Sequence, residues 1–304
     1  MRLGDVPGRQ PLPTAPSDAF RRRRFLERAV ERFRDVPRAP AARALLKRAY
    51  HSALMLQTGG RGLASALPGG EIVRALPEHR HLSWNRAEYD AFRQAVTPGM
   101  VALDVGANVG AYALLLGQWV GPTGTVVAFE PSPHTFVGLS RHVTLNGLQQ
   151  IVRPVMSAVG AEEGLMPLIV SGPSGESRLA HDAVSVSDGA LLDVEPDDQT
   201  PRVVSTPVTT IDHFCAQERI EPDFVKIDVE GWELEVLRGA RETIRRRTHL
   251  RLFVELHPSI WPLLGVTRRE IEAELDAQSL LVEPLAPTED AWALEGVCVR
   301  LRRA

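Results

Sequence analysis

The chain has 304 residues, of which 44% are hydrophobic and 24% are charged, and its formal net charge is −3. This composition is typical of a folded globular protein and excludes a wholly disordered chain or a fibrous repeat. The slight negative charge provides no general basic surface, so we expect no nucleic-acid partner.

Other features of the composition bear on the compartment. No run of about 18 apolar residues predicts a membrane span, and the N-terminus has no apolar segment typical of a secretory signal. Cys215 and Cys298 are too few for a disulfide scaffold and suit a reducing cytoplasm. Only two of the 35 basic residues are lysines, which indicates a GC-rich, bacterial genome. We therefore expect a cytoplasmic bacterial protein without membrane contact.

Residues 1–85 are predicted to form a flexible tail and a helical region, in front of a catalytic domain over residues 86–304. Helices are expected over residues 19–34 and 41–57. The first of them carries seven arginines and two glutamates, which fits either a patch for an acidic partner or a solvated helix face. The N-terminal region is a candidate lid, or a contact for the substrate or for a second copy in a homo-oligomer.

Strands and helices alternate along the rest of the chain. Strands are predicted over residues 101–105, 125–129, 151–156, 224–227, 250–255, 280–285 and 296–301. Helices are predicted over residues 109–120, 133–145, 232–245 and 267–277. This alternation indicates βαβ units and a parallel sheet. Residues 172–201 are rich in Gly, Ser, Pro and Asp and include an acidic stretch over 181–198, so we expect a long loop that acts as a lid or insertion.

The first motif joins the strand over residues 101–105 to a helix through Asp104, Gly106, Asn108 and Gly110. Glycines there allow a tight turn and the close approach of a ligand. Glu130 ends the next strand, where an acidic side chain accepts hydrogen bonds from the ribose hydroxyls of an adenosine. The two strand ends together predict an adenosine site.

Charge suggests which adenosine ligand this site takes. A dinucleotide site requires G-x-G-x-x-G facing a pyrophosphate, whereas the spacing here is G-x-x-x-G. We expect Asp104 to stand in the loop, where a carboxylate repels a pyrophosphate but attracts the ammonium and sulfonium of S-adenosylmethionine. The sequence therefore favours S-adenosylmethionine over NAD.

The second motif is Asp228-Val229-Glu230-Gly231, which follows the strand over residues 224–227. Ligands of open α/β sheets bind at the carboxyl ends of such strands. Paired carboxylates there either bind a hard cation such as Mg²⁺ or divide into a base and an orienting group. The alternative is that Glu230 and Glu233 simply favour the N-terminus of the following helix.

The third motif places Glu255 and His257 at the end of the strand over residues 250–255. Histidine is the usual proton acceptor near neutral pH, so His257 is a candidate base. The alternative is a strand-end histidine that makes only local hydrogen bonds.

These segments together resemble the FkbM family of S-adenosylmethionine-dependent methyltransferases. The resemblance extends over residues 88–257 and rests on VALDVGANVGAYALLLG, VVAFEPSPHTFVGLSRHVTLNGL, TPVTTIDHF, DFVKIDVEGWELEVLRGA and LFVELHP. It implies an α/β, Rossmann-like class I methyltransferase fold, with a seven-stranded, mostly parallel sheet whose last strand is antiparallel. The helical N-terminal region would be an addition to that fold.

The resemblance also implies cofactor contacts at Gly106, Asn108, Gly110 and Glu130, to which the charge argument above adds Asp104. It suggests that Asn146, Met156 and Ser157 lie near S-adenosylmethionine. His142 departs from the family, which often has asparagine four residues before the position of Asn146.

Family members generally methylate hydroxyl groups of natural products or sugars, so O-methylation of a small hydroxylated molecule is expected. We predict Asp228 or His257 as the base, with Glu230 and Glu255 orienting the acceptor or, together with Asp228, binding Mg²⁺. Two other hypotheses remain open: an NAD(P)-dependent oxidoreductase on the same fold, and a non-catalytic binding module of a biosynthetic assembly.

Overall fold

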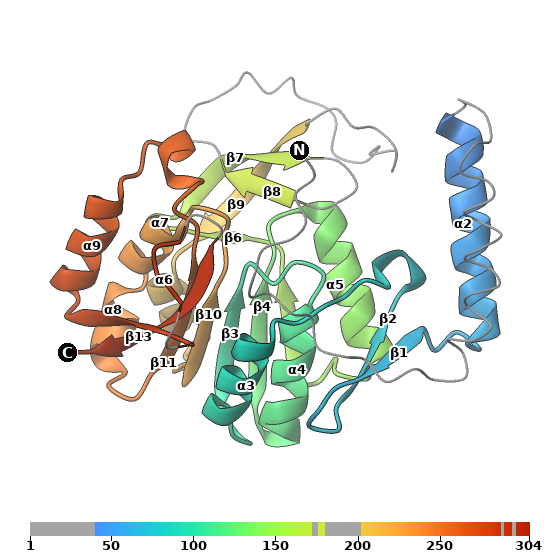
Figure 1. Cartoon of the computed structure of the whole chain (residues 1–304), viewed down its shortest axis with the longest axis horizontal. Coiled ribbons are helices and arrows are strands. Elements are labelled where there is room, and N and C mark those ends of the chain that lie inside the picture. Colours follow the sequence, from blue (N-terminus) through green and yellow to red (C-terminus); the bar gives the residue numbers. More distant parts are fainter. Residues whose placement is uncertain (1–39, 172–175, 180–201, 287–288, 294–295) are drawn as a thin grey trace.

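The structure, a computed structural model, describes residues 40–171, 176–179, 202–286, 289–293 and 296–304. Its centre is a seven-stranded sheet (Figure 1). In spatial order the strands are β12 (Leu280–Pro284), β13 (Val297–Arg303), β11 (Arg251–Leu256), β10 (Phe224–Ile227), β3 (Val101–Val105), β4 (Thr125–Phe129) and β5 (Val152–Val155).

All neighbouring strands from β11 to β5 are parallel, and β13 is antiparallel to both β11 and β12. The seven-stranded sheet with an antiparallel last strand is therefore confirmed. From β3 the chain passes to β4 on one side, and it returns later to β10 on the other side. This reversal is the topological switch point, where open α/β sheets form a crevice beyond the carboxyl ends of the strands.

Helices cover both faces of the sheet (Figure 1). One face packs against α3 (Arg86–Ala95), α4 (Ala111–Val120) and α5 (Pro133–Leu145). The other packs against α6 (Ile211–Glu218), α7 (Glu233–Arg238), α8 (Arg241–Arg246) and α9 (Arg268–Ala277). Alternate strand residues serve the two layers: Ala102 and Phe224 face the first, and Leu103 and Val225 face the second.

The helix expected over residues 232–245 is instead divided into α7 and α8. Gly239 lies between them, and a Cβ added to it would lie 2.0 Å from the Gly160 carbonyl oxygen. The backbones at Gly239 and Gly160 are therefore too close for a side chain at this position. Asp212 then accepts hydrogen bonds from the backbone N–H groups of Glu242 and Thr243 and caps α8. Thr267 and Glu270 form a capping box at the start of α9.

The N-terminal region is not only helical. After α2 (Pro40–Gln57) comes an antiparallel hairpin of β1 (Leu63–Ala66) and β2 (Ile72–Ala75), followed by a short 3₁₀ helix, η1 (Pro77–His79). A buried carboxylate, Glu71, ties this hairpin to the core, since it accepts hydrogen bonds from the Tyr89 hydroxyl and the Trp119 indole. The helix expected over residues 19–34 lies outside the described residues.

A second, four-stranded sheet lies beside the main one, with the order β6 (Ala158–Val159), β9 (Arg202–Thr209), β7 (Gly164–Ser171) and β8 (Glu176–Leu179). Its β8 falls within the segment expected to be a loop over residues 172–201. The acidic stretch over 181–198 lies outside the described residues. Two further 3₁₀ turns, η2 (Gly121–Thr123) and η3 (Trp261–Leu264), complete the elements, and no helix in the described part of the chain is long and apolar enough to cross a membrane.

Candidate active site

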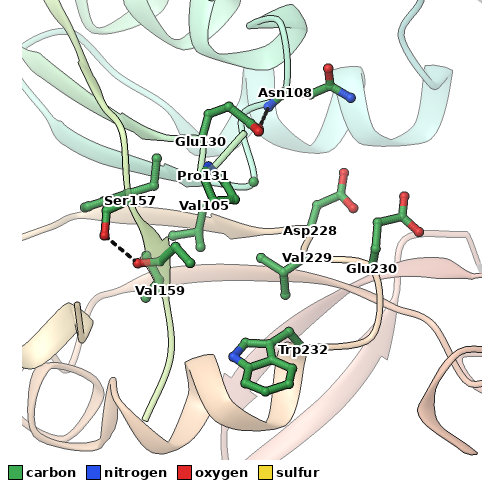
Figure 2. Close-up of a pocket in the computed structure, with 13 residues that line it drawn as sticks. Val105, Asn108, Glu130, Pro131, Ser157, Val159, Asp228, Val229, Glu230 and Trp232 are labelled. Atoms are coloured by element: carbon green, nitrogen blue, oxygen red, sulfur yellow. Dashed lines mark hydrogen bonds between the residues drawn. The ribbon is translucent and has the colours of Figure 1, made fainter. Parts of the chain in front are cut away.

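A pocket of about 110 Å³ opens at the switch point, at the carboxyl ends of β3, β4 and β10 (Figure 2). Its polar lining residues are Asn108, Glu130, Ser157, Asp228 and Glu230. Apolar side chains complete the walls, among them Val105, Phe129, Pro131, Val159, Val229 and Trp232. A cavity with apolar walls and a few converging polar groups is the usual form of a small-molecule site.

The loop after β3 forms one wall and depends on two unusual backbone conformations. Gly106 has φ 82°, and a Cβ added to it would lie 1.8 Å from the Asp228 carbonyl oxygen. Asn108 has φ 50°, and its backbone N–H donates to Glu130 Oε2 at 2.9 Å (Figure 2). Gly110, with φ 96°, begins α4 outside the pocket lining. The absent side chain at Gly106 therefore brings the ends of β3 and β10 into backbone contact.

Glu130 is buried at the edge of this loop. Its two carboxylate oxygens accept hydrogen bonds from the backbone N–H groups of Asn108 and Ser132, each at 2.9 Å. Burial raises the pKa of Glu130 to about 7, although these hydrogen bonds lower it. Each oxygen retains a lone pair, so the side chain is suited to accept hydrogen bonds from the hydroxyls of a ribose.

Glu130→Ala is expected to weaken S-adenosylmethionine binding roughly 10- to 100-fold, because hydrogen bonds to a charged group contribute about 1.5–3 kcal/mol. Calorimetric titration measures this change. Glu272→Ala, which removes an exposed carboxylate on α9 paired with Arg268, is the matched control. Wild-type affinity in Glu130→Ala would overturn the ribose assignment.

Asp104 lies in β3 and not in the loop. Its side chain alternates with that of Val105, which lines the pocket, so it projects to the opposite face of the sheet. There it is fully buried, and its carboxylate lies 3.8 Å from Lys226 Nζ. Burial raises the pKa of Asp104 to about 6. Direct attraction of a sulfonium by Asp104 thus has no geometric basis, and the carboxylates that border the pocket are those of Glu130, Asp228 and Glu230.

The other three residues expected near the cofactor have different positions, and Met156 is exposed and lies outside the pocket lining. Ser157 lines the pocket, and its hydroxyl donates to the carbonyls of Ala158 and Pro207. Asn146 lies outside the pocket lining, at the end of α5, where its amide exchanges two hydrogen bonds with the backbone of Arg74, both at 2.8 Å. The structure thus shows Asn146 fastening the N-terminal hairpin.

Asp228 lies between two cationic side chains. Lys226 Nζ donates to its Oδ2 at 3.0 Å, and His257 Nε2 lies 3.8 Å from its Oδ1. Although burial lowers the pKa of Lys226, the charges of Asp228 and Asp104 raise it above its ordinary value. Lys226 is only 3% exposed, so it is a permanent buried cation beneath the site.

Four carboxylates surround His257. Glu233 Oε1 lies 2.8 Å from its Nδ1, and Asp228, Glu230 and Glu255 lie 3.7–3.8 Å from its Nε2. Burial alone lowers the pKa of His257, but the hydrogen bond with Glu233 and these charges raise it to about 10. The ring is therefore an imidazolium at neutral pH. In this state it holds no lone pair to accept a proton, so the geometry favours Asp228 over His257 as the base.

Glu233 makes this arrangement rigid. It is fully buried, and besides His257 it accepts hydrogen bonds from the backbone N–H of Gly231 at 2.8 Å and from the Trp261 indole at 2.6 Å. Sequence reasoning considered Glu233 only as a helix-terminus residue, because its partners come from η3 and from the end of β11.

Glu233→Gln is expected to change the pH dependence of stability. The raised pKa of His257 contributes stability that is complete below about pH 6.5 and is lost as the pH rises toward 10. The variant lowers that pKa, so the decline in the free energy of unfolding between these values should become shallower. Urea unfolding at several pH values measures it, and parallel curves for both proteins would contradict the role of Glu233.

Magnesium does not fit this group of side chains well. Ligand atoms of Asp228, Glu255 and His257 lie within 4.8 Å of one another, whereas Glu230, which the sequence suggested as a ligand, is not in that cluster. Mg²⁺ prefers oxygen ligands in octahedral geometry, and only two of these three side chains, Asp228 and Glu255, offer oxygen atoms. Lys226 and His257 already provide positive charge beside the carboxylates.

The sequence analysis also did not identify Lys226 and Glu88, two residues near the site carboxylates on the face of the sheet that α3 and α4 cover. Lys226 was a detectable signal, since a lysine inside the apolar strand Phe224–Ile227 is rarely buried unless it pairs with an acidic side chain. Glu88 of α3 is buried nearby, and its burial together with the charge of Glu255 raises its pKa to about 7. No local pattern distinguishes Glu88 from an ordinary glutamate in the first turn of a helix.

The chain is similar to known methyltransferases. It is 29% identical over 204 residues to methyltransferase sdnD of Sordaria araneosa, covering 62% of this chain and 75% of that protein. It is 27% identical over 202 residues to the hexuronic acid methyltransferase AglP of Haloferax volcanii, covering 64% of this chain and 72% of that protein. Among solved structures, an FkbM methyltransferase from Methylobacillus flagellatus aligns with 17% identity and a TM-score of 0.42, over 71% of this chain and 50% of that one.

The family match covers more than half of the chain, since residues 104–278 match the Methyltransferase FkbM domain. This match includes the loop after β3, Glu130, Asp228 and His257, and it removes the NAD(P)-dependent oxidoreductase alternative. The residues of the pocket also fit the methyl donor: a glycine cradle that a Cβ would fill, and a buried carboxylate beside it. The chain therefore belongs to the FkbM family and is an S-adenosylmethionine-dependent methyltransferase of the Rossmann-like class I fold.

Proposed function

We propose that this protein methylates a hydroxyl group on a small natural product or sugar. The observation that carries the proposal is the Asp228 carboxylate, which borders the donor pocket between the Lys226 ammonium and the His257 imidazolium. A carboxylate in this position is suited to accept the proton of an acceptor hydroxyl.

Each side chain has a distinct role in this proposal. S-adenosylmethionine, when bound, supplies a methyl group on a positively charged sulfur. Glu130 and the loop at Gly106 hold the donor, and Asp228 orients the acceptor hydroxyl and takes its proton. Lys226 and His257 hold the Asp228 carboxylate in place, and Glu230 borders the acceptor. Alignment of the two reactants contributes most of the acceleration, at best about 7–11 kcal/mol.

The charge beside the pocket favours a hydroxyl over a carboxylate acceptor. Asp228 and Glu230 both line it, and Glu255 is buried close to His257. An anionic acceptor would meet Coulomb repulsion from these groups, whereas a neutral hydroxyl would not. The match to a hexuronic acid methyltransferase supports a sugar acceptor. A hexuronic acid is itself anionic, so the charge of this pocket favours a neutral sugar over a sugar acid.

The catalytic domain is proposed to comprise residues 86–304. The hairpin of residues 63–75 is attached to it through Glu71 and Asn146.

The proposal is tested with ¹³C-methyl-labelled S-adenosylmethionine and a panel of neutral sugars, the matching uronic acids, and hydroxylated polyketides. We expect a labelled methyl ether on a neutral acceptor, identified by mass spectrometry and by the chemical shift of the methyl carbon. A methyl ester on the uronic acids, or an N-methyl product, would overturn the hydroxyl assignment. Donor binding without transfer to any acceptor would instead favour the non-catalytic binding module.

A further inference from the structure

His142 of α5 connects two segments that are far apart in the sequence. The side chain is fully buried, its Nδ1 lies 2.7 Å from the Val109 carbonyl oxygen, and its Nε2 accepts the backbone N–H of Leu76 at 3.0 Å. Because Nε2 must offer a lone pair to that N–H, the ring proton lies on Nδ1 and donates to Val109. Both ring nitrogens are therefore used, in opposite roles.

One end of this bridge is the loop that forms the donor pocket. Val109 follows Asn108 directly, and the backbone N–H of Asn108 is the group that donates to Glu130. Asn108 has a positive φ of 50°, which asparagine adopts more readily than other non-glycine residues, and its own Oδ1 accepts a hydrogen bond from the backbone N–H of Val109 at 2.7 Å. The hydrogen bond from His142 fixes the carbonyl of the next residue, and so it restrains the loop at the point where it meets Glu130.

The other end is the N-terminal segment after β2. Leu76 is buried and follows the hairpin, which Asn146 holds through Arg74 one turn further along α5. Gln118 of α4 makes another such attachment, as its side-chain amide donates to the Ile72 carbonyl at 3.1 Å. The hairpin is thus fastened at several points, and the attachment through His142 also reaches the donor loop.

We propose that His142 is a positioning residue for the methyl donor, and that through it the segment Arg74–Leu76 contributes to the affinity for S-adenosylmethionine. Binding energies linked in this way are reciprocal. A donor that fixes the loop must therefore also strengthen the hydrogen bond of Leu76 to His142. This inference needs only the donor, so it stands or falls independently of the acceptor proposed above.

The test measures the dissociation constant of S-adenosylhomocysteine by calorimetry in three variants. His142→Phe keeps a ring of similar size and removes both hydrogen bonds, so we expect binding about 3- to 10-fold weaker, the loss of one or two neutral hydrogen bonds. His142→Gln keeps a donor and an acceptor and should recover at least part of that loss. Gln118→Ala cuts a different hairpin attachment and should lower the melting temperature while leaving the affinity within about twofold of wild type.

Equal affinity in His142→Phe and wild type would overturn the proposal, as would an equal loss in Gln118→Ala. Hydrogen exchange in the wild-type protein provides a second measurement that does not depend on the variants folding. Saturating S-adenosylhomocysteine should slow exchange of the Leu76 amide, and an unchanged rate would exclude the coupling.

Discussion

Asp228→Asn is expected to lower turnover at saturating S-adenosylmethionine by roughly 10²- to 10⁴-fold, the usual contribution of a positioned base. The substitution keeps the shape of the side chain, but an amide has no basic oxygen with which to take the proton of a hydroxyl. Donor affinity should change little, because Glu130 and the loop after β3 hold the donor in our assignment. Steady-state kinetics and calorimetry separate the two quantities.

Glu230→Gln is the matched variant for this experiment, since Glu230 also lines the pocket but its side chain is exposed. We expect it to raise the KM of the acceptor more than it lowers kcat. Unaltered turnover in Asp228→Asn would remove Asp228 from the mechanism, and a larger fall in Glu230→Gln would transfer the role of the base to Glu230.

Gly106→Ala is expected to have the largest effect on the donor site. The position has φ 82°, a conformation that costs an alanine about 1–3 kcal/mol. In addition, the new Cβ would lie 1.8 Å from the Asp228 carbonyl oxygen, so the backbone must separate there. We expect lower stability and the loss of measurable donor binding, because the loop and the Asp228 segment border the same pocket.

Gly99→Ala distinguishes the two contributions. Gly99 has φ 87°, but a Cβ there would meet only Thr123 Oγ1, at 3.6 Å. The Gly99→Ala variant therefore has the conformational cost of a positive φ without a backbone collision, and it should bind the donor like the wild type. Thermal unfolding and calorimetry of both variants measure the difference, and similar behaviour of the two would show that the contact between Gly106 and Asp228 is unimportant.

The pattern of apolar and polar residues within each segment was sufficient to predict most of the main sheet. The boundaries of β3, β4, β10 and α5 were predicted to the residue, because each is an apolar or amphipathic run ended by glycine, proline or a charged residue. The hairpin and the β6–β9 sheet were not predicted. Their strands are short or contain proline, as β7 and β9 do, and they form only through pairing with distant partners.

The composition of the candidate site was more predictable than its electrostatics. The sequence identified the strand ends that carry Glu130, Asp228 and His257, since parallel strands bring their carboxyl ends together. The protonation of His257 depends mainly on Glu233 and Asp228, which reach it from other elements, so the pattern of its own segment could not predict it. Asp104 was expected in the loop although the predicted strand over residues 101–105 already includes it. As a strand residue next to Val105, it directs its carboxylate to the other face of the sheet.

Lys226 also has a consequence for strand alignment during folding. In the observed pairing of β10 with β3, Lys226 stands opposite Asp104, on the face covered by α3 and α4. A slip of one residue would turn the ammonium toward the apolar layer beneath α6–α9, where an unpaired buried charge is strongly destabilising. The same side chain that serves the pocket thereby penalises a misaligned central strand.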